Sequence, residues 1–199
     1  RNFDPAIVGE ARGRAGMAII LSCAAIVAYL WLRFGSVQWG LAAVLCLVHD
    51  VIIVVGLVAA SAWLGNTMVG RWLGITSFKI DLPMIAAFLT VIGYSVNDTI
   101  VVFDRIRENR GRLQVISPAI LNRSINQTLA RTLLTSGTTL IVVIIMYVWG
   151  GHGIHAFSYA LLAGVIFGTY SSIAIASPLL LGFKKALVAS VSDTDANVQ

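Results

Sequence analysis

Charged residues are scarce in this chain: they make up 12% of its 199 residues, whereas 58% are hydrophobic. Soluble domains average about a quarter charged residues, so this chain has too little polar material to coat a water-soluble globule. Cysteine is also rare, and the two residues present lie inside apolar runs, which excludes a disulfide-stapled fold. The composition equally excludes disordered and collagen-like chains. The remaining class is a membrane protein that crosses the bilayer several times.

Five long apolar stretches are present, each near or above the roughly 20 residues that a helix needs to cross hydrocarbon. Their hydrophobic residues run continuously and do not alternate, which excludes the strands of an outer-membrane barrel. We therefore expect an all-α fold, a polytopic membrane helix bundle. The expected spans cover about 15–32, 39–64, 82–103, 132–149 and 154–183.

Lysine and arginine are shared unevenly between alternate loops, with nine on one side of the membrane and five on the other. The positive-inside rule then places the N-terminal end outside and the C-terminus in the cytoplasm. The richer side holds Arg33, Arg105, Arg107, Arg110, Arg112, Arg123, Arg131, Lys184 and Lys185. Because these residues flank the spans, the net charge of +5 marks membrane orientation and gives no indication of nucleic-acid binding.

Two segments lie outside the expected transmembrane domain, which covers 15–185. Residues 1–14 end a connection on the outer side, and 186–199 form a polar cytoplasmic tail. The outer loop 65–81 is rich in Gly and Thr and is expected to be irregular. Because the first residue is Arg1 and not methionine, we also expect the chain to be part of a longer protein.

The cytoplasmic segment 104–130 is expected to have two parts. Up to Arg112 it continues the third span as a charged, solvated extension. Ser117 and Pro118 then read as the N-cap and first residue of a new helix. Apolar residues follow at four-residue spacing, at Leu121, Ile125 and Leu129. This pattern predicts a short amphipathic helix lying on the inner membrane surface.

Only two of the nine acids, Asp50 and Asp98, lie within the apolar spans. An ionisable group in hydrocarbon is costly and usually marks an ion path. Asp98 lies about sixteen residues, or roughly 24 Å, from the outer start of its span. It is thus about a turn and a half inside the inner boundary. We interpret it as an acid that exchanges protons; the alternatives are a structural acid paired with a neighbouring helix and an acid reached by water from the cytoplasm.

Arg131 opens the fourth span at comparable depth, and Thr135, Thr138 and Thr139 continue a polar face from it. A guanidinium at this position would hold Asp98 ionised until a proton arrives. The alternative is an ordinary arginine at a helix end, with its charge extended toward water.

His49 and Asp50 are adjacent, so their side chains leave the helix about 100° apart and cannot both serve one site directly. We expect one to face the bundle interior while the other bonds to a neighbouring helix; a buried structural histidine is the alternative for His49. His152 and His155 are expected in a short outer turn.

Small residues recur every four positions in the fifth span, at Ala160, Gly164, Gly168, Ser172 and Ala176. Such a stripe lets another helix backbone approach closely, so we interpret it as a helix-packing surface. The sequence contains no motif of a phosphate loop, a metal cluster or a nucleophile triad, and we do not expect an enzyme.

The run GYSVNDTIVVFDRIREN, residues 93–109, closely resembles the signature of the SecD/SecF family, in the form that SecF members carry. LVHDV at 47–51 and RTLLTSGTT at 131–139 match two further motifs of that family in the same order. The family lies in the resistance–nodulation–division superfamily, whose members couple proton flow to transport. The resemblance implies that the five spans are the second to sixth helices of a six-helix half. The first helix and the periplasmic domain would lie outside this sequence, and 1–14 would end the periplasmic connection.

The resemblance also implies a proton relay of Asp98, Arg131 and Thr135, supported by other polar residues of the motifs. These supporting residues are Asn97, Thr99, His49, Asp50, Thr138 and Thr139. The outer loop 65–81 looks longer than is usual in the family.

The function implied is that of a Sec protein-export subunit in the bacterial cytoplasmic (inner) membrane. With SecD, it would use the proton motive force to promote preprotein translocation. The implied partners are SecD, the SecYEG channel with its associated translocase subunits, the exported preprotein and the lipid bilayer, without nucleic acid. We expect no cofactor, with protons as the coupling ion. The alternatives are a proton-coupled superfamily exporter of lipids or small molecules, and a purely scaffolding membrane subunit.

Overall fold

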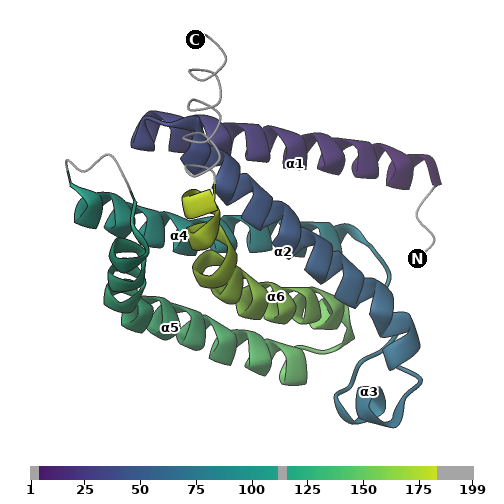
Figure 1. Cartoon of the computed structure of the whole chain (residues 1–199). Helices are drawn as coiled ribbons and strands as arrows, with labels where there is room; N and C mark the ends of the chain where they lie inside the picture. Colours follow the sequence, from purple (N-terminus) through teal and green to yellow (C-terminus); the bar gives the residue numbers. More distant parts are fainter. Residues whose placement is uncertain (1–4, 112–115, 183–199) are drawn as a thin grey trace, which may run out of the picture.

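The structure, a computed structural model, describes residues 5–111 and 116–182 (Figure 1). Within these ranges the regular structure is entirely helical, and five helices are long and apolar enough to cross a membrane. The predicted all-α, polytopic helix bundle is therefore confirmed. The elements are α1 (Pro5–Phe34), α2 (Val37–Leu64), α3 (Met68–Trp72), α4 (Leu82–Arg110), α5 (Pro118–Trp149), α6 (His152–Ser171) and the π-helix η1 (Ser172–Ala176).

Most helices extend beyond the predicted spans. Helix α1 begins at Pro5, well before the expected start near residue 15, and α4 continues past residue 103 to Arg110 as the predicted charged extension. After η1 the last helix resumes over residues 177–182. The predicted tail at 186–199 lies outside the described residues.

The loop 65–81 is more ordered than predicted, because it contains the short helix α3. Thr67 caps this helix, and its hydroxyl accepts a hydrogen bond from the Gly70 amide at 3.0 Å. The loop is also tied back to α2, where the Ser61 hydroxyl accepts from the Phe78 amide at 3.2 Å. Asp81 then caps α4, as the apolar start near residue 82 had indicated.

The predicted amphipathic segment is helical and begins as expected, with the Ser117 hydroxyl accepting from the Ile120 amide at 3.3 Å. The expectation that this helix is separate from the fourth span is wrong. The segment is the first part of α5, which Figure 1 shows at an angle to the rest of that helix. No Gly or Pro interrupts residues 119–136, so nothing in the sequence ends the helix there. Its apolar residues Leu121 and Ile125 pack into the protein core.

Helix α4 lies at the centre of the bundle and packs against α2, α5 and α6, whereas α1 packs mainly against α2. Gly35, with φ of 69°, turns the chain between α1 and α2, a conformation that costs other residues more. At this end α1 and α4 finish and α5 begins; we call it the basic end. The opposite end, with 65–81 and the α5–α6 turn, is the loop end.

Candidate functional site

Both acids that the sequence singled out are inside the bundle: Asp50 is 0% exposed and Asp98 is 3% exposed. Asp50 is on α2 and Asp98 on the central helix α4. Taking an ionised aspartate into hydrocarbon costs roughly 2.5–3.5 kcal/mol on insertion scales, and such groups are generally paired within the bundle. Their surroundings therefore decide which protonation states each can adopt.

Asp98 is surrounded by hydroxyl groups from two other helices. The Ser136 hydroxyl on α5 donates to Asp98 Oδ2 at 3.2 Å. Thr169 on α6 lies behind Ser136, with 2.7 Å between the two hydroxyl oxygens. Asp98 thus connects α4 to α5 and, through Ser136, to α6.

Asp50 has its own hydroxyl donors. Ser95 on α4 donates to Asp50 Oδ2 at 2.5 Å, and Ser171 on α6 donates to the same oxygen at 2.7 Å. The π-helix η1 starts at the next residue, and π-helical turns are frequent at functional sites. Ser95 lies one turn before Asp98 on α4, so the two acids are linked through that helix.

His49 and Asp50 are in direct contact, contrary to the expectation that one of them would turn away. His49 Nδ1 lies 3.1 Å from Asp50 Oδ1. The His49 side chain is long enough to reach Asp50, although adjacent side chains leave a helix about 100° apart. Its ring remains partly exposed, whereas the Asp50 carboxylate is buried.

Arg131 and Thr135 lie beside the inner face of α5, not on it. That face carries Thr128, Thr132 and Ser136, all buried, whereas Arg131 and Thr135 are exposed. In the part of the chain that the structure describes, Asp98 and Arg131 form no ion pair. The neighbour of Asp98 is therefore Ser136, one position after the expected Thr135.

The supporting residues divide between the interior and the surface. Thr99 is buried and its hydroxyl donates to the Ser95 carbonyl at 3.1 Å. Asn97 is exposed on α4. Thr138 and Thr139 donate to carbonyls of their own helix. These two threonines therefore have no recorded bond to either acid.

The small-residue stripe of α6 faces α4, where the two helices are in close contact. A Cβ added at Gly164 would collide with the Val91 side chain, and one at Gly168 would lie 3.2 Å from Ser95 Cβ. The second contact matters for the site, because Ser95 is the residue that donates to Asp50.

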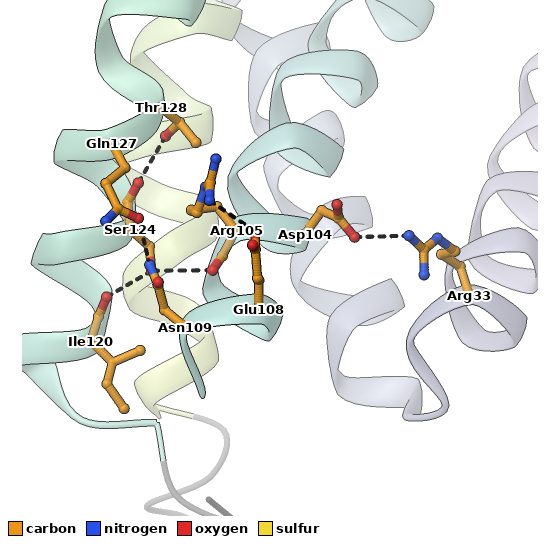
Figure 2. Close-up of polar contacts among 9 residues, drawn as sticks. All are labelled: Arg33, Asp104, Arg105, Glu108, Asn109, Ile120, Ser124, Gln127 and Thr128. Atoms are coloured by element: carbon orange, nitrogen blue, oxygen red, sulfur yellow. Dashed lines mark hydrogen bonds and ion pairs between the residues drawn. The ribbon is translucent and has the colours of Figure 1, made fainter. Parts of the chain in front are cut away.

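Polar contacts join α4 to α5 and α1 at the basic end (Figure 2). Asn109 on α4 donates to Ser124 and Gln127 of α5, each at 2.9 Å. On the other side, Arg33 of α1 pairs with Asp104 at 2.9 Å. An open cavity of about 280 Å³ lies between these contacts, and its walls include Arg131 and Thr128. Arg131 is thus accessible from the basic end.

The sequence interpretation missed the hydroxyl partners of the acids, Ser95, Ser136, Thr169 and Ser171. One signal was available, since hydroxyl residues recur at every fourth position of α5 from Ser124 to Ser136. That spacing predicts a buried polar stripe. The α6 residues carried no comparable signal. The described residues contain no group of three or more His, Cys, Asp or Glu side chains that could hold a metal ion.

These features define a multi-pass helical membrane protein with two carboxylates held among hydroxyl groups inside the bundle. Such a carboxylate can carry a proton or release it.

The comparisons with known proteins identify the family. A family profile described as "Protein export membrane protein SecD/SecF, C-terminal" matches residues 2–186. The chain is 49% identical to the protein translocase subunit SecF of Desulfurispirillum indicum, over 89% of this chain and 52% of that protein. It is 44% identical to the protein translocase subunit SecDF of Brucella abortus, over 88% of this chain and 21% of that protein. The chain belongs to the SecD/SecF family.

A solved structure agrees with this assignment. SecDF from Thermus thermophilus is 40% identical and superposes with a TM-score of 0.76, over 92% of this chain and 23% of that one. The chain spans about half the length of the SecF relative described above, and less of the two SecDF proteins.

Proposed function

We propose that this chain is the membrane-embedded part of a Sec protein-export subunit that works with SecD. It would use the proton motive force to promote preprotein translocation through the SecYEG channel and its associated subunits. The family membership and the SecF and SecDF relatives support this role. Those relatives carry the names of translocase subunits, which supports a role in transport and not in enzyme catalysis. Protons are the coupling ion in this proposal, and no cofactor takes part.

The observation that carries the proton role is the position of Asp98. It is 3% exposed at the centre of the bundle, and its recorded neighbour is a neutral hydroxyl. A permanent ion pair would hold this carboxylate ionised. A neutral neighbour that can both donate and accept leaves it free to take up a proton.

The exposed polar residues of the spans support SecD as a partner. Asn97 on α4 and Arg131 and Thr135 on α5 are exposed, although they lie within or beside membrane-spanning segments. Polar side chains at this depth generally face a protein or water and not lipid. We propose that helices of SecD cover this side of α4 and α5, where Arg131 and Thr135 would act with Asp98 and an acid from SecD.

The proposed location is the bacterial cytoplasmic (inner) membrane, with the basic end in the cytoplasm. The charge asymmetry between the loops supports this orientation. The cavity beside Arg131 would then open to the cytoplasm, and the loop 65–81 would lie on the outer side.

The test is Asp98→Asn in the complete subunit, reconstituted with SecD and the translocase in vesicles that carry a proton gradient. The amide keeps the shape of the side chain but carries no exchangeable acid proton. We expect the gradient-dependent part of preprotein export to be lost, while SecD still copurifies. Glu108→Gln, the same change at an exposed acid of α4, is the matched control and should export normally.

Two outcomes would contradict the proposal. Normal gradient-dependent export by Asp98→Asn would exclude the proton role. Loss of SecD copurification in that variant would instead favour a purely scaffolding subunit, in which the buried acid serves assembly.

A further inference from the structure

Three oxygen atoms form a line that leads from Asp98 into α6. Ser136 Oγ lies 3.2 Å from Asp98 Oδ2, and Thr169 Oγ1 lies 2.7 Å from Ser136 Oγ. Thr169 Oγ1 also lies 2.7 Å from the Val165 carbonyl oxygen, one turn earlier on α6. The Thr169 hydroxyl therefore has two acceptors within reach, although it can donate to only one of them at a time.

The direction of these hydrogen bonds depends on the proton of Asp98. An ionised carboxylate only accepts, so Ser136 must donate to Asp98 and Thr169 can donate to Ser136. A protonated carboxyl group donates, so Asp98 can donate to Ser136, Ser136 to Thr169, and Thr169 to the Val165 carbonyl. Every hydroxyl proton along the line has an acceptor in both states. This matters because an unsatisfied buried donor is costly.

We propose that Ser136 and Thr169 form a hydrogen-bond chain that reverses its direction when Asp98 takes up a proton. This inference rests on the proposed role of Asp98 as the proton carrier and names two positioning residues for it. The arriving proton forms an O–H bond with a carboxylate oxygen of Asp98. The two hydroxyl groups keep their own protons and only rotate, so no other bond is broken. Release of the proton restores the first arrangement.

The hydrogen-bond chain also transmits the protonation state of Asp98 to α6. In the protonated state the Val165 carbonyl accepts from Thr169, and in the ionised state it loses this bond to Ser136. Thr169 is two residues before Ser171, which donates to Asp50, and three before the start of η1. Proton uptake on α4 thus changes hydrogen bonding at the irregular part of α6.

Asp50 has a shorter line of its own. Ser95 and Ser171 both donate to one oxygen of Asp50, at 2.5 and 2.7 Å. The Ser171 hydroxyl also lies 3.1 Å from the Gly168 carbonyl oxygen, so it has a second acceptor when Asp50 donates to it. The line from Asp50 therefore passes through one hydroxyl of α6, whereas the line from Asp98 passes through hydroxyls of both α5 and α6.

Charged and titratable side chains on the helices around Asp98 take no part in this chain. Within residues 5–111 and 116–182, none of them forms a recorded hydrogen bond or ion pair with Asp98. They include His49 and Asp50 on α2, Tyr94 and Asp104 on α4, Arg131 on α5 and Tyr170 on α6.

The test compares Ser136→Ala, Thr169→Val and Thr169→Ser in the complete subunit with SecD. Infrared difference spectra would record the carbonyl stretch of protonated Asp98, assigned by its absence in Asp98→Asn. Export driven by a proton gradient would be measured on the same preparations. Ser158→Ala and Thr90→Val are matched controls, because their hydroxyls donate only to carbonyls of their own helices.

In Ser136→Ala we expect the Asp98 carbonyl band to move to higher wavenumber, because the acid proton loses its acceptor. Gradient-driven export should fall by roughly tenfold, the value of one hydrogen bond to an ionised group. Thr169→Val should give an intermediate loss, and Thr169→Ser should retain export, because it keeps the hydroxyl. The two controls should match the unmodified protein.

Two results together would overturn the proposed hydrogen-bond chain. They are an unshifted Asp98 carbonyl band in Ser136→Ala and normal export in both Ser136→Ala and Thr169→Val. If Asp98→Asn were inactive in the same experiment, the proposed proton role would still stand. Normal export by Asp98→Asn would overturn the proposed function itself.

Discussion

Gly164 shows how a single missing side chain permits close helix packing. It lies where α6 meets α4, and a Cβ there would collide with Val91, whose branched side chain has little freedom to move. The same interface brings Thr169 and Ser171 of α6 toward the two acids. The glycine therefore contributes to the site indirectly, because it allows α6 to pack close to α4.

We expect Gly164→Ala to destabilise the protein by about 1–3 kcal/mol, the usual cost of overpacking a buried contact. Reversible unfolding in detergent micelles would measure the change. Gly56→Ala on α2 is the control, because nothing lies within 4 Å of a Cβ added there. That variant should be neutral or slightly more stable, since alanine favours helix more than glycine. Equal stability of the two variants would contradict the packing argument.

One histidine contacts α5 and the loop 65–81 from α6 at the loop end, where the Tyr147 hydroxyl also donates to the Leu73 carbonyl at 2.9 Å. His155 Nδ1 lies 3.0 Å from the Tyr147 carbonyl oxygen, and its Nε2 lies 2.9 Å from the Gly74 carbonyl oxygen. Its ring also stacks on Tyr147, with 4.2 Å between the ring centroids. His155 was expected in a turn, but it belongs to the first turns of α6. A neutral imidazole donates to one of the two carbonyls, and only the protonated ring donates to both.

We expect His155→Phe to loosen the loop while leaving the helices intact. The phenyl ring preserves the stacking but donates to neither carbonyl. Hydrogen exchange of backbone amides in residues 70–78 should become faster by roughly five- to tenfold, as expected for the loss of one hydrogen bond. His152→Phe is the matched control at an exposed histidine of the same helix. Unchanged exchange in His155→Phe would show that the loop is held by its other contacts.

At the scale of the whole molecule, the two ends and the sides of the bundle differ in chemistry. Arginine is concentrated at the basic end, and large apolar side chains are exposed along the helices. Among them are Ile20, Leu32, Ile52, Leu134 and Ile141, each at least 60% exposed. Such an apolar surface is unfavourable in water and suits hydrocarbon or a neighbouring helix.

The proposed orientation can be tested with cysteines introduced at the two ends. After replacement of Cys23 and Cys46, Thr76→Cys and Asn122→Cys each place one thiol at an exposed position. We expect a membrane-impermeant maleimide to label Thr76→Cys in intact spheroplasts, and Asn122→Cys only after lysis, because basic loops are retained in the cytoplasm. The opposite pattern would reverse the orientation of the bundle.

The sequence alone determined the membrane class, the five spans and the position of Asp98 inside one of them. These features depend on composition and on hydrophobic runs, which are local properties of the chain. It also gave the helix start at Ser117, because a cap needs only residues that are close in sequence. The continuity of α5 through residues 119–136 could have been predicted on the same basis, from the absence of Gly and Pro.

Only the tertiary structure decided which groups surround the acids. Ser136 faces Asp98, while Arg131 and Thr135 do not, because the rotation of α5 against α4 sets which positions lie inside. A rotation of 100°, one residue, separates Thr135 from Ser136. The four-residue spacing of hydroxyl residues places Ser136 on a polar stripe, but it does not show that this stripe meets Asp98. Thr169 and Ser171 approach the acids only because the glycines of α6 allow it to pack closely on α4. Those contacts depend on three helices at once, which is why they are absent from any single stretch of sequence.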